Sequence, residues 1–462
     1  MDALPTPNPL RIDGATQALG IALTFAQPVD QMLHDYFRTR RDLGPLDRAF
    51  VAELVFAVLR RWRTLTARAS VLPAPGAPDA PAAPATGATS AISPAAEPAP
   101  AAINLPPPGP TPRRLVLVAL TSVFGLSARA LEQAIGRNDA EWLATTHTVN
   151  LAGLTAAQAL DIPDWLYQRL IAQHGAAHTA ALVTALNHPA PLDLRVNPMK
   201  IDRAGAMAAL QARGIQAYAT PWSPLGLRIE GRPALVREPL FMSGAIEVQD
   251  EGSQLLALLV APKRREMVVD FCAGAGGKTL ALGAMMHSTG RLYAFDVSAR
   301  RLRALEPRLK RSGLSNVQSQ VLSSETDNKV KRLAGKIDRV LVDAPCTGLG
   351  TLRRNPDMKW RQPESAVAEM AAKQTAILAS AARLVKPGGR LVYATCSLLA
   401  EENRAVVDAF LAAQPDFALR PASEVLSAQG IALDTGPCLE LTPDRHHTDG
   451  FFAAVLQRVV AG

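Results

Sequence analysis

A chain of 462 residues is longer than one hydrophobic core usually organises, so we expect two or three domains. The hydrophobic fraction of 48% is ordinary for a globular protein, and no stretch of about 18 apolar residues lacks charges and prolines, which excludes a membrane span. The net charge of +8 favours a polyanionic partner, and four cysteines without CxxC spacing exclude a disulfide scaffold and a CxxC metal site.

The N-terminal part of the chain has the pattern of a helical region with a long interruption. Its first residues, MDALPTPNPLRIDG, lack the basic and apolar segments of a secretory signal, so we expect a cytoplasmic protein. Residues 27–70 carry apolar side chains at helical spacing, and this pattern resumes at Arg113. The Ala/Pro-rich residues 72–112 bury too little apolar surface to order. We predict a helical domain over residues 1–185 with a disordered insertion at 72–112.

The remainder of the chain changes to strands alternating with helices. A short strand, a helix and two strand-like runs predict a small α+β module over residues 186–248. From 249 to 462 repeated β-α units predict an α/β domain, with a mostly parallel sheet covered by helices on both faces. The last run, FFAAVLQRV, is expected to close this sheet as an edge strand.

Ligands of such sheets bind beyond the carboxyl ends of the strands, so the residue that closes each strand is a candidate site residue. Four predicted strands end in Asp270, in Asp296, in Asp343, and in Thr395 followed by Cys396. Carboxylates and a thiol are therefore expected at one edge of the sheet.

The first of these strands runs into a glycine-rich loop. Its small residues allow a ligand to approach the backbone, and the amides of the following helix N-terminus would face it. Asp296 lies about 20 residues further on, where a carboxylate can accept both ribose hydroxyls of an adenosine-containing cofactor. The loop residues expected to bind the cofactor are Cys272, Ala273, Gly274, Ala275, Gly276, Gly277 and Lys278.

Two common nucleotide-binding loops are each excluded by one residue. A Walker A loop ending at Lys278 would require glycine at position 272, which is Cys272. A dinucleotide GxGxxG starting at Gly274 would require glycine at position 279, which is Thr279. A plain strand-to-helix turn remains the alternative, although the acids at the strand ends disfavour it.

Two cysteines, Cys346 and Cys396, are expected at neighbouring strand ends facing the cofactor. A single buried cysteine is more often a small hydrophobic residue, but two are harder to explain in that way. Methylation of carbon 5 of cytosine requires a thiolate to add at carbon 6, a proton donor at N3, and a base for the carbon 5 proton. Asp343 is the nearest donor, and Lys278 either helps electrostatically or reaches solvent. On these grounds either thiol could be the nucleophile.

Four segments in combination resemble the Sun-type (NOL1/NOP2/Sun family) RNA cytosine-C5 methyltransferases, in particular the bacterial enzymes that modify small-subunit (16S) rRNA. These segments are DFCAGAGGKT, DAPCTGLGTLRRNPDMKW, ATCSLLAEEN and DGFF. The resemblance implies a Rossmann-like class I methyltransferase fold, S-adenosylmethionine as cofactor, and an rRNA partner bound by a NusB-like N-terminal domain and by the α+β module. It further implies that Cys396 is the nucleophile, that Cys346 assists release of the methylated RNA, and that Asp343 contributes to the cofactor site.

The chain departs from the family pattern at three places. Thr347 stands where serine is usual, which should leave Cys346 usable, and Ala275 stands where proline is frequent. The third strand of the family usually ends in an acid that holds the adenine amino group. Here that neighbourhood reads Leu322-Ser323-Ser324-Glu325-Thr326-Asp327, and the contact is left unassigned.

The remaining polar segments are less informative. Arg353–Arg361 interleaves cations with Trp360, which predicts either base stacking or a solvated basic loop. The arginines after Asp296 are interpreted as a solvated face, and no metal site is expected at His446 and His447. We expect a monomer. The alternatives to rRNA methylation are an RNA-binding assembly factor without catalysis and a tRNA methyltransferase.

Overall fold

A computed structural model describes residues 4–70 and 109–460. Most of the predicted insertion, 72–108, lies outside the described residues. The chain divides into two compact units, one of residues 169–354 with 365–462 and one of residues 2–168 with 355–364. Within the described ranges, no helix is long and apolar enough to cross a membrane.

The second unit is helical, as the spacing of its apolar residues predicts. The ten-residue segment 355–364 belongs to this unit although it follows the Pro-Cys motif of the other unit in sequence. The helices are α1 Pro9–Ala22, α2 Val29–Thr39, α3 Pro45–Arg60, α4 Trp62–Ala69, α5 Pro112–Ser122, α6 Ala128–Ile135, α7 Arg137–Thr145, α8 Ala156–Ala159 and α16 Met358–Arg361, and α9 Asp164–Leu186 begins here.

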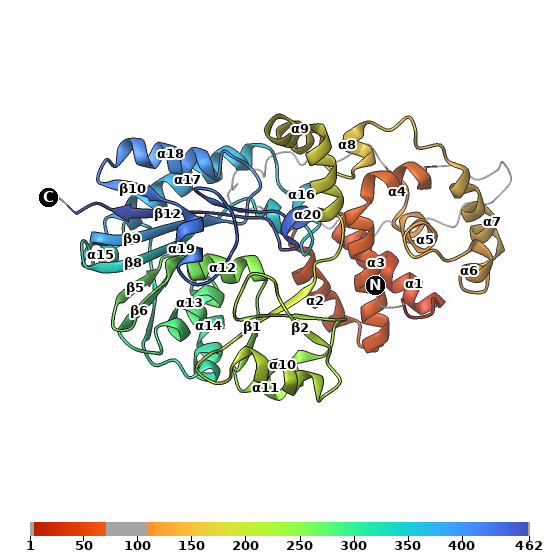
Figure 1. The fold of residues 1–462 in the computed structure, drawn as a ribbon. Coiled ribbons are helices and arrows are strands. Elements are labelled where there is room, and N and C mark those ends of the chain that lie inside the picture. The colour runs from red at the N-terminus through yellow and green to blue at the C-terminus, as the bar shows by residue number, and fades with distance from the viewer. Residues whose placement is uncertain (1–3, 71–108, 461–462) are drawn as a thin grey trace, which may run out of the picture. The chain divides into compact units, whose positions relative to one another are not determined.

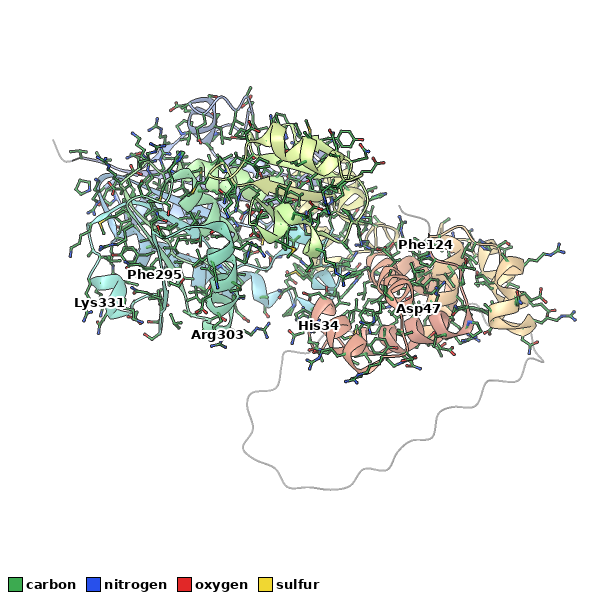
Figure 2. The ribbon with its side chains drawn as sticks, turned by 90° about the horizontal axis from the view of Figure 1, so that it is seen from below. His34, Asp47, Phe124, Phe295, Arg303 and Lys331 are labelled. Atoms are coloured by element: carbon green, nitrogen blue, oxygen red, sulfur yellow. The ribbon has the colours of Figure 1, made fainter. Side chains whose placement is uncertain are left out.

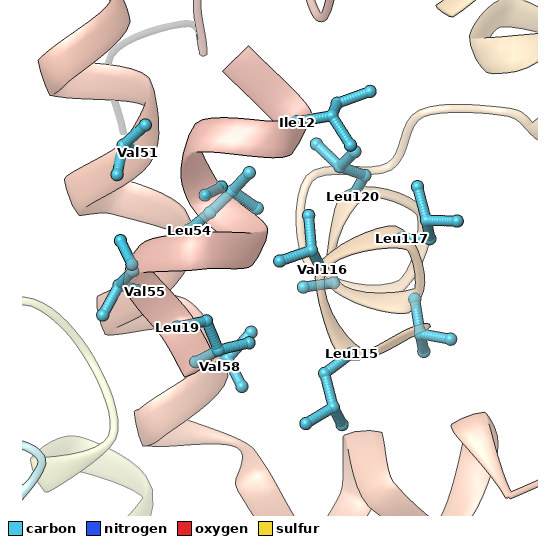
Figure 3. Close-up of a cluster of buried hydrophobic side chains, with 14 of the residues drawn as sticks. Ile12, Leu19, Val51, Leu54, Val55, Val58, Leu115, Val116, Leu117 and Leu120 are labelled. Carbon is cyan, nitrogen blue, oxygen red and sulfur yellow. The ribbon is translucent and has the colours of Figure 1, made fainter. Parts of the chain in front are cut away.

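Buried aliphatic side chains hold the helical unit together. Ile12 and Leu19 of α1 meet Leu54 of α3 and Val116 of α5 in a core without solvent exposure (Figure 3). The helix ends carry local caps: the side chain of Asn8 accepts the Arg11 amide at 2.9 Å, and Pro9 occupies the first turn of α1. Helix ends and core therefore follow from local sequence.

The α+β module of the first unit is a four-stranded antiparallel sheet of order β2-β3-β1-β4. The fourth strand was not predicted. The elements are β1 Leu192–Val196, α10 Arg203–Gln211, β2 Ala217–Ala219, β3 Gly226–Ile229, α11 Pro239–Met242 and β4 Ile246–Val248.

The large sheet has eight strands in the order β10-β12-β9-β8-β5-β6-β7, with β11 paired to β12. Strands β5 to β9 are parallel, as predicted (Figure 1). The strands are β5 Met267–Asp270, β6 Arg291–Asp296, β7 Val317–Val321, β8 Ile337–Asp343, β9 Val385–Thr395, β10 Phe417–Arg420, β11 Leu439–Leu441 and β12 Phe451–Arg458. The helices are α12 Glu251–Val260, α13 Gly277–Met285, α14 Ala299–Ser312, α15 Asn328–Lys331, α17 Ser365–Ala382, α18 Arg404–Ala413, α19 Ala422–Ser427 and α20 Pro443–His446.

Helices cover both faces of this sheet, as the apolar runs predict. Alternate residues of β9 separate the two cores: Leu391 and Tyr393 pack with the side of α17 and α18, and Val392 and Ala394 pack with the side of α12 (Figure 1). Both sets are fully buried, which explains why the strand is apolar without alternation.

The prediction that the last strand lies at the edge is wrong. Strand β12 lies inside the sheet, because β9 pairs with one side of it while β10 and β11 pair with the other, all antiparallel. The run FFAAVLQR is buried from Phe451 to Leu456, as an interior strand requires.

Candidate functional site

Four strand ends lie close together where the order in which the chain adds strands to the sheet reverses. The chain leaves β5 for β6 and β7 on one side and returns to β8 and β9 on the other, so β5 lies between β6 and β8. The four strands end at Asp270, Asp296, Asp343 and Thr395, as predicted. Such a switch point is where open α/β sheets bind ligands.

The glycine loop between β5 and α13 has little room behind it and open space in front. Gly276 has a φ of +83°, and a Cβ there would lie 2.0 Å from Cδ1 of Leu305. A Cβ on Gly274, whose φ is +56°, would meet nothing within 4 Å. Only glycine therefore suits the inner position, and the outer one leaves the backbone open to a ligand.

Asp296 holds this loop in place. Its Oδ2 accepts the amide of Gly274 at 2.8 Å, and its Oδ1 accepts the amide of Ser298 at 2.7 Å. Each carboxylate oxygen retains a second lone pair, so Asp296 can still accept ribose hydroxyls beside the open face of Gly274. The loop and Asp296 thus fit an adenosine-containing cofactor.

The other predicted loop residues differ in exposure. Cys272 and Gly277 are half-buried, Ala273 is buried and Ala275 is exposed. Burial raises the pKa of the Cys272 thiol well above its usual value, so this cysteine stays protonated. Sequence reasoning missed Arg195 of β1, whose Nη1 donates to the carbonyl of Gly277 at 2.7 Å. Nothing local in the sequence indicated that contact.

Asp270 is a buried carboxyl at the centre of the site. One oxygen accepts the Thr279 hydroxyl at 2.6 Å, while the other is buried without a hydrogen-bond partner among the described residues. Burial raises the pKa of Asp270 to about 7, with the Asp343 carboxylate contributing in the same direction.

Lys278 does not reach solvent, which was one of its two predicted roles. Its Nζ donates to Oδ2 of Asp343 at 2.6 Å. Burial alone would lower the pKa of the Lys278 ammonium, but Asp343 more than offsets this and Cys396 contributes further, so the pKa is raised. A retained ammonium charge therefore lies among Asp343, Asp270 and the Cys396 sulfur.

The two predicted thiols are in contact. The sulfurs of Cys346 and Cys396 are 3.3 Å apart. The contact with Cys396, followed by burial, raises the pKa of the Cys346 thiol well above its usual value, so Cys346 stays protonated. The amide of Gly350 donates to the carbonyl of Cys396 at 2.8 Å, and the amide of Gly450 from the DGFF motif donates to the carbonyl of Gly350 at 2.8 Å. Three motifs distant in sequence are thus bonded together around the thiols.

Sequence reasoning missed two ion pairs that Arg354 forms close to this loop. Arg354 Nε donates to Asp449 at 2.5 Å and its Nη2 donates to Asp250 at 2.9 Å. Burial raises the pKa of Asp449 to about 6, with Asp250 contributing in the same direction. Asp449 and Arg354 both belong to quoted motifs, and that membership was the available indication.

The segment after Arg354 does not match the prediction of a solvated basic loop. In the helical unit, Trp360 packs edge-on against Trp62 with ring centroids 5.1 Å apart, and its Nε1 donates to the Leu59 carbonyl at 2.8 Å. Lys359 is only 1% exposed and donates to the carbonyl of Arg60 at 3.0 Å. Burial lowers the pKa of Lys359 to about 7. Lys359 is thus buried and Trp360 is half-buried against the helical core, so this part of the segment is not a solvated basic loop.

The arginines of helix α14 are of two kinds, exposed ones and ones that form ion pairs. Arg301 and Arg303 are exposed, and Arg303 lies at the surface of its unit (Figure 2), as a solvated face predicts. Arg308 and Arg311 instead bind Glu247 at 3.0 and 2.5 Å. In the third-strand neighbourhood, Asp327 accepts the amides of Ser323 and Lys329 and acts as a helix cap. The adenine contact therefore stays unassigned.

His446 is also engaged within the fold, since its Nδ1 accepts the amide of Thr442 at 3.0 Å. Among residues 4–70 and 109–460, no group of three or more His, Cys, Asp or Glu side chains could hold a metal ion.

Known proteins resemble this chain in sequence and in fold. The profile of the family described as "16S rRNA methyltransferase RsmB/F" matches residues 257–457, and a ferredoxin-like domain of the same proteins matches residues 162–235. A probable ribosomal RNA small subunit methyltransferase B of Synechocystis is 33% identical over 91% of this chain and 93% of its own length. The chain belongs to the RsmB/F family of rRNA methyltransferases. It is therefore an S-adenosylmethionine-dependent rRNA methyltransferase.

Further relatives agree with this assignment. The ribosomal RNA small subunit methyltransferase B of Sodalis glossinidius is 36% identical over 63% of this chain and 64% of its own length. Among solved structures, a methyltransferase homologue from Pyrococcus horikoshii is 29% identical, with a TM-score of 0.57, over 66% of this chain and all of the other. NSun6 from the same organism, solved with SFG, is 22% identical, with a TM-score of 0.58, over 65% of this chain and 99% of its own, and shares the fold.

Proposed function

We propose that this RsmB/F enzyme transfers a methyl group to carbon 5 of a cytidine in small-subunit (16S) rRNA through a covalent bond between Cys396 and carbon 6. The observation that carries the proposal is the pair of thiols in contact, 3.3 Å apart, beside the Lys278–Asp343 pair. Carbon 5 of cytosine is a weak nucleophile, and addition of a thiolate to carbon 6 makes it enamine-like.

Each residue of the site is assigned to a step of this reaction. The Cys396 thiolate adds to carbon 6, and the Lys278 ammonium provides a positive charge near the sulfur. As the sulfur adds to carbon 6, N3 of the base takes up a proton, and Asp343 at the adjacent strand end is placed to pass it on from its carboxyl group. The resulting carboxylate then accepts the N3–H hydrogen bond while Lys278 donates to its Oδ2. After methylation a base removes the carbon 5 proton, the C5–C6 double bond forms again, and the bond from carbon 6 to sulfur breaks.

Cys346 serves this last step. It remains a neutral thiol, because its contact with Cys396 and its burial raise its pKa. A thiol 3.3 Å from the leaving sulfur can hydrogen-bond to the thiolate as the bond to carbon 6 breaks. The resemblance to the Sun-type enzymes assigns attack to Cys396, and the protonated state of Cys346 fits its assigned role in release.

S-adenosylmethionine, when bound, supplies the methyl group. Asp296 would hold the ribose hydroxyls, and the backbone of Cys272 to Gly277 would line the cofactor together with Lys278 and Asp343. This arrangement leaves the thiols on the β8 and β9 side for the RNA base.

We further propose that the helical region of residues 1–185 and the module of residues 186–248 bind rRNA, with the domain of residues 249–462 carrying catalysis. The excess of positive charge favours such a partner. We expect a monomeric enzyme acting in the bacterial cytoplasm, where small-subunit rRNA is assembled.

The test is methylation of defined RNAs by the purified protein. Unmodified 16S rRNA and, separately, unmodified tRNA are incubated with methyl-labelled S-adenosylmethionine, and the nucleosides are identified by mass spectrometry. We expect 5-methylcytidine in 16S rRNA, located at a single position by bisulfite sequencing. Label in tRNA alone would identify the tRNA alternative, and binding without any label would identify an assembly factor.

A further inference from the structure

Glu402 is a fully buried carboxylate that does not touch the reacting groups. It follows the Thr-Cys-Ser motif and lies at the centre of four hydrogen bonds. Its Oε1 accepts the Thr347 amide at 2.8 Å and Nε2 of Gln374 at 3.0 Å. Its Oε2 accepts the Thr347 hydroxyl at 2.5 Å and also the Ser397 hydroxyl. All four lone-pair positions of the carboxylate are used by protein donors.

The residues that Glu402 binds are the immediate neighbours of the two thiols. Thr347 follows Cys346, and Ser397 follows Cys396, so one carboxylate bonds the β8 loop to the β9 loop. Gln374 of α17 anchors the arrangement to the scaffold, because its Nε2 also donates to the carbonyl of Pro345 at 2.9 Å. The Cys346 loop is therefore held on both sides of its cysteine.

The next residue, Asn403, fixes the other loop in the same way. Its Oδ1 accepts the Thr395 hydroxyl at 2.5 Å, and its Nδ2 donates to the carbonyl of Ser397 at 3.0 Å. The Tyr393 hydroxyl donates to the Glu402 carbonyl at 2.6 Å and fixes the backbone between them. Cys396 thus lies between two residues that the same short segment holds.

We propose that Glu402 is a positioning residue that sets the distance between the Cys346 and Cys396 sulfurs by binding the residue after each cysteine. This inference rests on the proposed two-cysteine function and adds the group that keeps the two thiols in register. A buried carboxylate is costly unless its donors are present, so the four donors and Glu402 hold one another in a single arrangement.

The substitutions of Glu402 differ in what they leave. Glu402→Gln keeps one oxygen for the two N–H donors, and its amide can donate to the Thr347 and Ser397 hydroxyls, which can turn to accept. Glu402→Ala removes every bond. Glu401→Gln is the matched control, because Glu401 is part-exposed and binds Arg169 instead.

The distance between the sulfurs is measured by capture of phenylarsine oxide, which loses its oxygen as water and forms one As–S bond to each of two nearby thiols. Cys346→Ala, which leaves one thiol of the pair, gives the background. We expect Glu402→Ala to weaken capture by about tenfold or more, as expected when a buried charged acceptor is removed from its donors. Glu402→Gln should retain most of the capture, and Glu401→Gln should match the wild type.

The same variants separate positioning from general destabilisation. Glu402→Ala should bind S-adenosylhomocysteine as the wild type does and keep its KM for S-adenosylmethionine, while kcat falls in parallel with capture. If Glu402→Ala does not fold, Thr347→Val and Thr347→Ser replace it. The first loses the hydroxyl bond to Glu402 and should weaken capture, and the second keeps it and should restore capture.

Undiminished capture by a folded Glu402→Ala protein, or equal capture by Thr347→Val and Thr347→Ser, would overturn the inference. Capture does not depend on RNA or on methyl transfer. A Cys396→Ala enzyme that still methylated rRNA would therefore contradict the proposed function, while the positioning role of Glu402 would still be decided by the arsenical.

Discussion

The two halves of the methyltransferase sheet end in different kinds of chemistry. On the β5 and β6 side, a glycine loop presents backbone to the ligand, and Asp296 fixes it through two amides. On the β8 and β9 side, two thiols meet, and buried side chains from α17 and from the segment after Cys396 hold them. In the proposed reaction the first half receives the cofactor and the second half holds two reactive sulfurs at a fixed distance.

Because of this difference, we expect the two halves to tolerate different substitutions. The cofactor half depends on the absence of side chains, as at Gly276, where a Cβ would lie 2.0 Å from Leu305. The thiol half depends on a network in which each polar group has its partner, such as Glu402 with Thr347. We therefore expect changes in the cofactor half to affect mainly binding and changes in the thiol half to affect mainly turnover.

The largest effect is expected from Cys396→Ala, because no addition to carbon 6 can occur without the nucleophile. Methyl transfer to 16S rRNA should fall by roughly 10⁶-fold, as for removal of the covalent nucleophile of a serine protease. Calorimetric binding of S-adenosylhomocysteine should stay at the wild-type value. Substantial turnover by this variant would contradict the proposal that the β8 and β9 side of the sheet supplies the nucleophile.

The next effect is expected from Cys346→Ala, which leaves addition intact but removes the thiol beside the leaving sulfur. One methyl group per enzyme should be transferred quickly, with multiple turnover lost and an RNA adduct accumulating that survives denaturing electrophoresis. Single-turnover and steady-state rates measured on the same preparation check this. Steady-state turnover at the wild-type rate would show that release needs no second thiol.

A smaller effect, on binding alone, is expected from Asp296→Asn. Loss of charged hydrogen bonds to the ribose should weaken cofactor binding by about 10- to 100-fold, while the rate at saturating cofactor changes little. Titration of S-adenosylmethionine in the methylation assay measures both. Glu306→Gln, an exposed position on α14, is the control. A variant with normal KM and reduced kcat would place Asp296 in the reaction itself.

The last prediction concerns stability and not activity, and it rests on Asp270, whose pKa burial raises to about 7. Because the folded pKa lies above the unfolded value of about 3.9, the contribution of Asp270 to stability is present below about pH 4 and is lost as the pH rises through 7. Asp270→Asn should remove this loss of stability. The free energy of unfolding of the variant, relative to that of the wild type, should therefore increase between pH 4 and 7 and stay constant above pH 7. Urea unfolding at several pH values measures it, and parallel curves for the two proteins would contradict the assignment.

The sequence predicted the residues at the strand ends because local pattern decides where a strand stops. Asp270, Asp296, Asp343 and Thr395 are the last residues of β5, β6, β8 and β9, as the sequence predicts, and Cys396 follows Thr395 directly. The neighbours of β12 could not be predicted, because β10 precedes it in sequence yet pairs on its far side. The burial of Lys359 and the packing of Trp360 could not be predicted for the same reason, since their partners Arg60 and Leu59 lie about 300 residues away in the sequence.

The role proposed for Glu402 was not predicted from the sequence. Glu402 lies in the segment ATCSLLAEEN, in which only Cys396 has chemistry that the reaction requires. The role of Glu402 depends on Thr347 and Gln374, which come from two other elements, so it emerges from the assembled sheet and α17 rather than from spacing along the chain.

Mass spectrometry can identify the amino acid that bonds to RNA and so decide whether Cys396 is the nucleophile. Cys346→Ala protein is incubated with 16S rRNA and S-adenosylmethionine, the covalent species is digested with protease and nuclease, and the modified peptide is sequenced by mass spectrometry. We predict a 5-methylated cytidine bonded to Cys396, absent from the Cys346→Ala/Cys396→Ala protein. A nucleotide bonded to any other residue, or an active Cys396→Ala enzyme, would contradict the account.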